Sequence, residues 1–185
     1  MKRVLIDIDD VITNQDGWLH IVNDFLNTNY NIDDVKGYYI QDLVPKDKKE
    51  EFTQFFITQN TYEYSKINDN CIEVIKELND KYEVYICSTY IFRDDLMYSG
   101  DALKYKFEFL VKNFQFMDAN RFTFHTNKSI INCDIKIDDK MENLENASTK
   151  ILYTAYHNKI ISDEELNKQN IIRANNWNDI RKILL

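Results

Sequence analysis

Val4-Leu5-Ile6-Asp7-Ile8-Asp9-Asp10, near the start of the chain, joins a short apolar run to three aspartates. The apolar run shows no alternation of polar and apolar side chains, which favours a strand buried on both faces of a parallel sheet. The aspartates follow where such a strand would end. We therefore expect a buried strand whose carboxyl end presents carboxylates.

Further strands and helices alternate along the rest of the chain. Strands are predicted at residues 83–87, 121–124, 133–137, 150–153 and 171–172, and helices at residues 69–80, 102–114 and 176–184. Asp69 is expected to cap the first of these helices, and Leu103, Phe107, Leu110 and Val111 to form the apolar side of the second. Alternation of this kind implies right-handed crossovers and an open parallel sheet.

Residues 13–66 interrupt this alternation. They contain two helical patterns, at residues 18–26 and 48–56, and no clear strand. We interpret them as a helical insertion after the first strand. The predicted division is a core of residues 1–12 and 67–185 and an inserted cap of residues 13–66.

Composition limits the class of protein and its partners. The chain has 185 residues, of which 44% are hydrophobic, and a net charge of -8. A sizeable core can be buried, and the negative charge disfavours binding to nucleic acid polymers or anionic membranes. Three cysteines without metal-ligand spacing, Cys71, Cys87 and Cys133, fit reduced thiols in a cytoplasmic protein, and no run approaches the roughly 20 apolar residues of a membrane span.

Polar side chains lie at the predicted carboxyl ends of several strands. Ser88 and Thr89 follow the second strand, Lys128 follows the third by a few residues, and Asp138 and Asp139 end the fourth. In open α/β sheets ligands bind beyond these strand ends. We expect all these groups to converge with Asp7 and Asp9 on one edge of the sheet.

Carboxylates gathered in this way require protons or a cation. Two unit charges about 4 Å apart interact by roughly 4 kcal/mol at an effective dielectric constant of 20. Hard oxygen ligands suit Mg²⁺, which shares its coordination shell with a substrate phosphate. Lys128 would add a second positive charge for the phosphoryl oxygens. The pattern predicts a magnesium-dependent site for a phosphorylated small molecule.

The two first aspartates are expected to have different roles. Asp7 is the candidate nucleophile, because a carboxylate can attack phosphorus and form an aspartyl-phosphate. If the backbone stays extended, Asp9 shares a face with Asp7 and can protonate the leaving group and later activate water. Ser88 is expected to hydrogen-bond a phosphoryl oxygen.

The ordered set Asp-x-Asp, Ser or Thr, Lys and Asp-Asp resembles that of haloacid dehalogenase-like hydrolases. The closer resemblance is to the 5'(3')-deoxyribonucleotidase family. It is carried by residues 4–12, by Ile86-Cys87-Ser88-Thr89, by Lys128 ten positions before Asp138, by Ile137-Asp138-Asp139-Lys140 and by Asn176-Trp177-Asn178-Asp179-Ile180. The match covers most of the core and is weak across the insertion.

The resemblance implies an α/β, Rossmann-like three-layer core with a mainly parallel sheet and a small helical cap. It implies Mg²⁺ held by Asp7, by the backbone carbonyl of Asp9 and by Asp139, with Asp138 as neighbour or alternative ligand. Ser88, Thr89 and Lys128 would bind phosphate. The implied reaction is hydrolysis of nucleoside monophosphates to nucleoside and phosphate.

The chain departs from the family pattern near these motifs. Asp10 stands where the family has glycine, Tyr90 and Met141 where it has prolines, and Lys140 where it has arginine. These changes affect the expected substrate more than the expected chemistry. The first alternative is therefore a phosphatase for another small metabolite. A phospho-receiver module and a catalytically silent binding protein rank lower.

The roles of histidines and cap aromatics are open at this point. His20, His125 and His157 lack a spaced ligand partner, so no metal role is predicted for them. Four cap aromatics could stack on a nucleobase or form the core of the cap: Trp18, Phe25, Tyr38 and Tyr39. Helical spacing favours the core for at least one of Trp18 and Phe25.

Overall fold

The computed structural model describes residues 1–185 and contains one six-stranded sheet. All strand pairs are parallel, and the strand order is β3-β2-β1-β4-β5-β6. The strands are β1 Arg3–Ile6, β2 Glu83–Ser88, β3 Phe122–Phe124, β4 Cys133–Asp138, β5 Ala147–Tyr153 and β6 Ile171–Ala174. The α/β fold with an open parallel sheet is as predicted.

β1 lies between β2 and β4, where the direction of strand order reverses. Its apolar residues pack on both sides: Val4 and Ile6 belong to the main core, and Leu5 packs with Cys87 and Cys133 on the other face. The carboxyl ends of neighbouring strands diverge at such a switch point and leave room for a ligand. The aspartates after β1 therefore lie at the favoured ligand position of this architecture.

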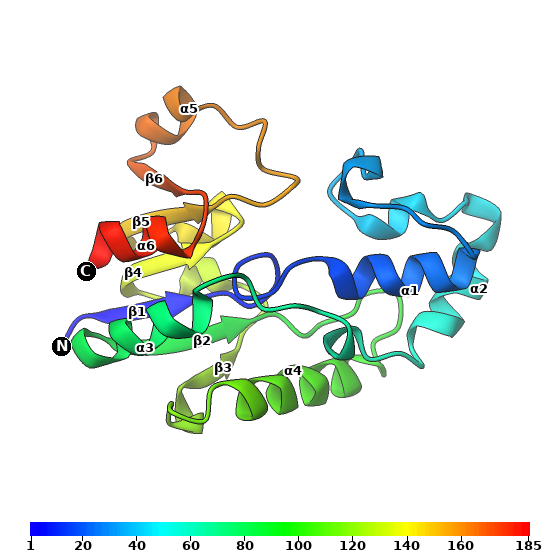
Figure 1. Cartoon of the computed structure of the whole chain (residues 1–185), viewed down its shortest axis with the longest axis horizontal. Coiled ribbons are helices and arrows are strands. Elements are labelled where there is room, and N and C mark those ends of the chain that lie inside the picture. Colours follow the sequence, from blue (N-terminus) through cyan, green and yellow to red (C-terminus); the bar gives the residue numbers. More distant parts are fainter.

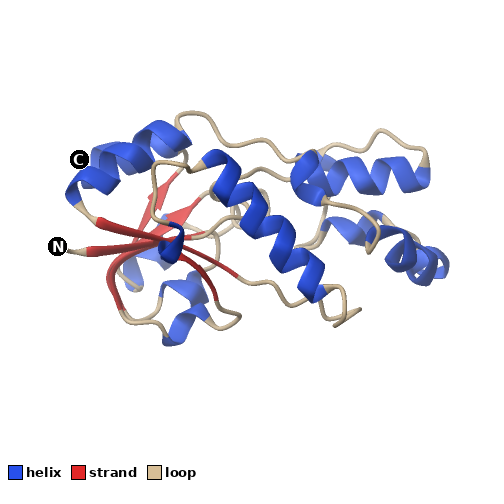
Figure 2. Ribbon diagram, turned by 90° about the horizontal axis from the view of Figure 1, so that it is seen from below, coloured by secondary structure: helices blue, strands red, loops and turns tan.

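Helices cover the two faces of the sheet unequally (Figure 2). The helices α3 Cys71–Lys81, α4 Ser99–Asn113 and α6 Trp177–Leu184 pack on one face and contribute to the main core. The opposite face is covered by α5 Asp163–Lys168 and by short 3-10 turns, which include η6 Lys128–Ile130 and η7 Met141–Leu144. η6 is the first element after β3, and η7 is the first element after β4.

The segment after β1 extends away from the carboxyl ends of the strands (Figure 1). It contains α1 Asp16–Leu26, α2 Lys49–Phe56 and the 3-10 turns η1 Ile32–Asp34, η2 Ile40–Leu43, η3 Lys46–Lys48 and η4 Thr61–Glu63. A separate hydrophobic cluster joins α1, α2, η1 and η2, and it also includes Tyr98 just before α4. The cluster supports a cap at residues 13–66, whose boundaries stay a prediction.

Two local predictions were wrong. α3 begins at Cys71 rather than Asp69, because Asn70 turns the chain with a φ of 62° and makes no side-chain cap. On α4 the predicted apolar side is rotated: Phe107 and Val111 are 42% and 44% exposed. Of the predicted residues Leu110 is buried, and α4 buries Lys106 and Phe109 beside it.

No helix is long and apolar enough to cross a membrane. The three cysteines are buried and unpaired. Both chain termini lie at the end of the sheet opposite the cap (Figure 1).

Candidate active site

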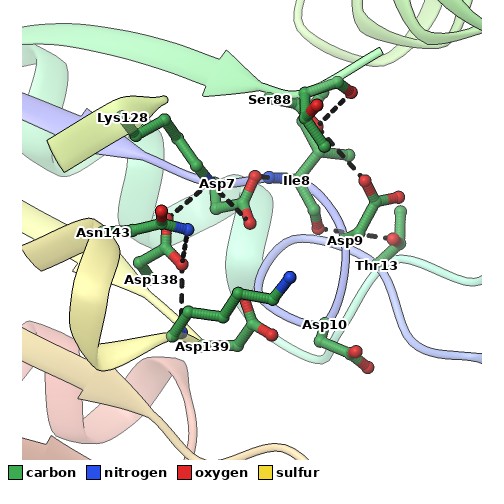
Figure 3. Close-up of polar contacts among 12 residues, drawn as sticks. Asp7, Ile8, Asp9, Asp10, Thr13, Ser88, Lys128, Asp138, Asp139 and Asn143 are labelled. Carbon is green, nitrogen blue, oxygen red and sulfur yellow. Dashed lines mark hydrogen bonds and ion pairs between the residues drawn. The ribbon is translucent and has the colours of Figure 1, made fainter. Parts of the chain in front are cut away.

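The chain turns sharply once β1 ends. The N–H groups of Ile12 and Thr13 both donate to the carbonyl of Ile8, at 2.8 and 2.9 Å. Asp10 sits in this turn with a φ of 63°, in the left-handed region that glycine adopts most easily. The shared face of Asp7 and Asp9 was conditional on an extended backbone, and the chain turns from Ile8 onward; the two carboxylates have different partners (Figure 3).

Asp7 shares one lysine with Asp138. Lys128 Nζ lies 2.9 Å from Asp7 Oδ2 and 2.5 Å from Asp138 Oδ2, and all three side chains are buried. Burial raises the pKa of both carboxyls to about 6, although the Lys128 charge opposes this shift. Burial also acts to lower the Lys128 pKa, but the two carboxylates outweigh it and raise the value.

Asp9 is held by donors from three other elements. Tyr62 Oη and Lys106 Nζ lie 2.5 Å from its two carboxylate oxygens, and Ser88 Oγ donates over 3.2 Å. Burial acts to raise the pKa of Asp9, but Lys106 and the hydrogen bonds together lower it below the usual value. These contacts therefore favour the ionised form of Asp9.

Lys106 was missed by the sequence analysis. Its ammonium lies 2.7 Å from Ser88 Oγ as well as bonding Asp9, and the side chain is buried. The available signal was its position: Lys106, Phe109 and Leu110 have the spacing of one helix face. The buried face of α4 was predicted from apolar residues alone. The face that contains Lys106 was therefore not chosen.

The acidic pair at the end of β4, Asp138 and Asp139, also has hydrogen-bond partners. Asp138 Oδ1 accepts hydrogen bonds from the Lys140 N–H at 3.0 Å and from Asn143 Nδ2 at 2.9 Å. Asp139 Oδ2 lies 2.8 Å from His157 Nε2, and its backbone carbonyl accepts from Asn158 Nδ2. The contact with His157 was not predicted.

Two overlapping groups of side chains could hold a metal ion. Ligand atoms of Asp7, Asp138 and Asp139 all lie within 4.8 Å of one another, and the same is true of Asp10, Asp139 and His157. The first group offers only carboxylate oxygens, which fits Mg²⁺. The carboxylate of Asp9 belongs to neither group, so any contact from this residue to the metal would come from its backbone.

Asp10 adds a further buried carboxyl group. Its Oδ2 lies 3.8 Å from His157 Nε2, and its side chain is 11% exposed. Burial, reinforced by the negative charge of Asp139, raises its pKa well above the usual value. The residue that replaces the family's glycine thus adds a buried carboxyl group whose charged form is disfavoured beside Asp139.

The predicted phosphate-binding residues are at the expected edge. Ser88 is buried at the end of β2 and contacts Asp9 and Lys106. Thr89 follows it, and only its backbone carbonyl joins the network, as an acceptor from Ser88 Oγ at 3.3 Å. Ser88, Lys106 and Lys128 therefore each donate to Asp7 or Asp9.

A cleft of about 360 Å³ adjoins the acidic pair and reaches the cap. Tyr38 and Tyr39 line it from the cap side, opposite Asp139, Lys140 and His157. Trp18 and Phe25 pack inside the cap instead, with ring centroids 4.4 Å from Phe56 and 5.3 Å from Phe52, respectively. Of the four candidate aromatics, the two tyrosines are thus the ones that face the cleft.

Similarity to known proteins agrees with this geometry. A provisionally named 5'(3')-deoxyribonucleotidase of Staphylococcus aureus is 26% identical over all of this chain and 96% of its own length. The 5'(3')-deoxyribonucleotidase of Bacillus subtilis is 39% identical over 64% of each chain. A haloacid dehalogenase-like hydrolase from Streptococcus pneumoniae superposes over 100% of this chain and 99% of its own, with a TM-score of 0.58 and 12% identity, which shows the shared fold.

The family model described as "5' nucleotidase, deoxy (Pyrimidine), cytosolic type C protein" matches residues 1–185. The match spans the insertion as well as the core, so it covers the segment where the motifs alone were weak. The chain therefore belongs to this nucleotidase family and is a phosphoric monoester hydrolase, and it has the fold of a haloacid dehalogenase-like hydrolase.

Proposed function

We propose that this protein is a Mg²⁺-dependent phosphatase that forms an aspartyl-phosphate on Asp7 and hydrolyses deoxynucleoside monophosphates. The observation that carries the proposal is the separation of the two carboxylates on one turn. Asp7 faces Lys128 and the acidic pair, whereas Asp9 is held by Tyr62 and Lys106. A nucleophile and a proton-transfer group need such different surroundings.

The metal would be held by Asp7 and Asp139, with Asp138 as neighbour and the Asp9 carbonyl as the ligand implied by the family resemblance. When bound, Mg²⁺ supplies positive charge for the phosphoryl oxygens. Lys128, Ser88 and Lys106 would add hydrogen-bond donors for those oxygens. Because Lys128 binds Asp7 and Asp138 at the same time, it also keeps the nucleophile beside the acidic pair.

The reaction would have two steps on the protein's own groups. An Asp7 oxygen attacks phosphorus, the bond from phosphorus to the nucleoside oxygen breaks, and that oxygen takes a proton from Asp9. Water then attacks phosphorus and gives a proton to Asp9, and the bond to Asp7 breaks. Lys106 favours the ionised form of Asp9, which is the form that accepts the proton in the second step. The first step needs the protonated form, so the interaction with Lys106 has to weaken when substrate binds.

The cleft beside Asp139 supports a nucleoside as the leaving group. Tyr38 and Tyr39 are partly exposed there, at 36% and 54%. Aromatic faces of this kind stack on bases of any identity. A phosphatase for another phosphorylated metabolite is the second candidate, because Lys140 and His157 also line the cleft and could bind a polar leaving group.

A phosphate-release screen on the purified protein with Mg²⁺ separates the two candidates. The panel contains deoxynucleoside and ribonucleoside monophosphates, 5' and 3', beside sugar phosphates and glycerol phosphate. We expect a deoxynucleoside monophosphate to give the highest kcat/KM. Much faster turnover of a sugar phosphate would leave the phosphatase chemistry in place and reject the nucleotide assignment.

The nucleophile is tested by Asp7→Asn. The amide has nearly the same shape but cannot attack phosphorus, so kcat should fall to the detection limit while the folded structure persists. Circular dichroism and a thermal melt report folding, and rapid acid quench with radiolabelled substrate reports the phospho-enzyme in the wild type. Activity close to wild type in a folded Asp7→Asn variant would remove Asp7 from this role.

A further inference from the structure

A lysine lies in the middle of β4 with no carboxylate partner. Lys136 is 1% exposed, and it belongs to no ion pair. Its ammonium group donates instead to two backbone carbonyls, those of Lys128 at 2.8 Å and Glu145 at 2.5 Å. A buried charge is costly unless such hydrogen bonds compensate it, and burial lowers the Lys136 pKa accordingly. The contacts therefore explain how the charge is tolerated.

The two carbonyls belong to turns that both supply groups to Asp138. Lys128 begins η6, and its side chain reaches Asp7 and Asp138. Glu145 directly follows η7, which carries Asn143, the donor to Asp138 Oδ1. The Lys136 ammonium thus links the backbone of one turn to that of the other.

A second contact joins the same pair of turns. Asn146 Nδ2 donates to the carbonyl of Ser129 at 2.9 Å, and the Asn146 carbonyl accepts from the Cys133 N–H at the start of β4. Asn146 has a φ of 59°, which allows the chain to leave η7 and enter β5 beside this contact. The link between η6 and η7 therefore consists of a buried ammonium and an exposed amide.

We propose that Lys136 is a positioning residue for catalysis: it holds η6 against η7 so that the Lys128 ammonium is placed between Asp7 and Asp138. This inference rests on the role proposed above for Lys128. Lys136 forms no ion pair with Asp7 or Asp138, because its ammonium bonds the two backbone carbonyls instead. It acts only through the backbone of Lys128. A displacement of a catalytic group by about 1 Å can lower a rate by about 100-fold.

The first test replaces Lys136 by methionine, which keeps the length of the side chain but has no donor. We expect kcat to fall about 10- to 100-fold, KM to change by less than about 2-fold, and inhibition by orthovanadate to weaken in proportion to kcat. Orthovanadate mimics the transferring phosphoryl group, so it reports the placement of Lys128. Lys150→Met is the matched control: Lys150 pairs with Lys136 across β4 and β5 but makes no ion pair or side-chain hydrogen bond.

Asn146→Gly keeps the left-handed backbone, removes the exposed amide and leaves no buried cavity. It is the second variant if Lys136→Met does not fold, and it should lower kcat in the same direction by a smaller factor. All rates are measured at a temperature at which each variant is fully folded. Wild-type kcat and vanadate inhibition in the folded variants would overturn the inference.

A double-variant experiment distinguishes this inference from the function proposed above. If Lys136 acts through Lys128, Lys136→Met should cause no further loss of kcat in a Lys128→Met background. If Lys136→Met lowers kcat in the Lys128→Met background by as much as in the wild type, the inference is wrong and the role of Lys128 stands. Wild-type activity of Lys128→Met itself would instead reject the proposed role of Lys128.

Discussion

Two residues of the site, Lys106 and Asp10, change how the aspartates after β1 ionise. Lys106 keeps the Asp9 pKa low, whereas Asp10 is itself a buried carboxyl group whose pKa is raised. Neither effect could be read from the Asp-x-Asp pattern, because both depend on charges that other elements bring within a few ångströms.

Lys106→Met should lower kcat by about 100-fold and change the pH profile. Without the lysine the pKa of Asp9 rises, because burial then outweighs the remaining hydrogen bonds. A general base with a raised pKa loses activity at a higher pH, so the acidic limb of the kcat/KM profile should move upward. Lys104→Met is the control, since Lys104 lies on the same helix and pairs only with Glu108 on the surface. If the acidic limb does not move, Lys106 does not control the ionisation of Asp9.

Asp10→Gly should stabilise the metal-free protein more at pH 7 than at pH 4. The folded-state pKa of Asp10 is raised above the unfolded value of 3.8, so the fold loses stability as pH rises from that value through the folded-state pKa. Glycine removes this loss, so the free energy of unfolding should rise more at pH 7 than at pH 4. Chemical denaturation in the presence of a chelator measures it. Asn27→Gly, at another left-handed position without a carboxyl group, should show no such pH dependence.

At the scale of elements, the inserted segment contributes to the site through η4. Tyr62 on this turn reaches Asp9, and its ring packs against Phe109 of α4, with centroids 5.0 Å apart. The turn is kept in place by α1, which approaches it at Gly17. A Cβ on Gly17 would lie 2.2 Å from the carbonyl oxygen of Thr61, so only glycine allows this approach. Helix α1 therefore influences Asp9 without touching it.

Gly17→Ala should force α1 and η4 apart. The expected cost is about 1 to 3 kcal/mol in the free energy of unfolding, together with a lower kcat because Tyr62 moves away from Asp9. Gly100→Ala is the matched control: Gly100 also lies at the start of a helix, and a Cβ there meets nothing within 4 Å. Thermal denaturation and steady-state rates of both variants test this. Equal behaviour of the two would show that the close approach of α1 is unimportant.

For the molecule as a whole, the acidic site makes stability depend on metal and pH together. The pKa values of Asp7 and Asp138 are both raised to about 6 in the metal-free protein. Since these exceed the unfolded value of 3.8, ionisation of the pair costs stability as pH rises from about 4 through about 6. A bound cation would compensate the same charges.

Addition of Mg²⁺ should therefore raise the thermal unfolding temperature more at pH 7.5 than at pH 5. At the lower pH, protons compete with the metal for the carboxylates. At a Mg²⁺ concentration about 100 times its dissociation constant, the expected stabilisation at pH 7.5 is about 2.7 kcal/mol. Asp7→Asn should reduce this increment, because it removes a ligand. An increment that is equal at both pH values would argue against a carboxylate metal site.

Most of the core could be predicted from local patterns. The short apolar runs marked the strands, and the polar residues after them marked the edge at which Asp7, Ser88, Lys128 and Asp138 meet. These inferences hold because parallel strands bury both faces and place their carboxyl ends on one side of the sheet. The order of the motifs along the chain then determined, without any coordinates, the family that the sequence resembles.

Only the tertiary structure decided which other side chains join the site at this edge of the sheet. Lys106 and Tyr62 reach Asp9 from a helix and a cap turn, and His157 reaches Asp139 from the loop after β5. Their sequence distances from these partners follow no period, so no local pattern could pair them. Lys136 illustrates the same limit. A lysine within a strand predicts an exposed side chain, and only the structure shows the two carbonyls that accept its hydrogen bonds. Local sequence sets where the strands end. The packing of elements that are distant in sequence sets which groups the long polar side chains contact.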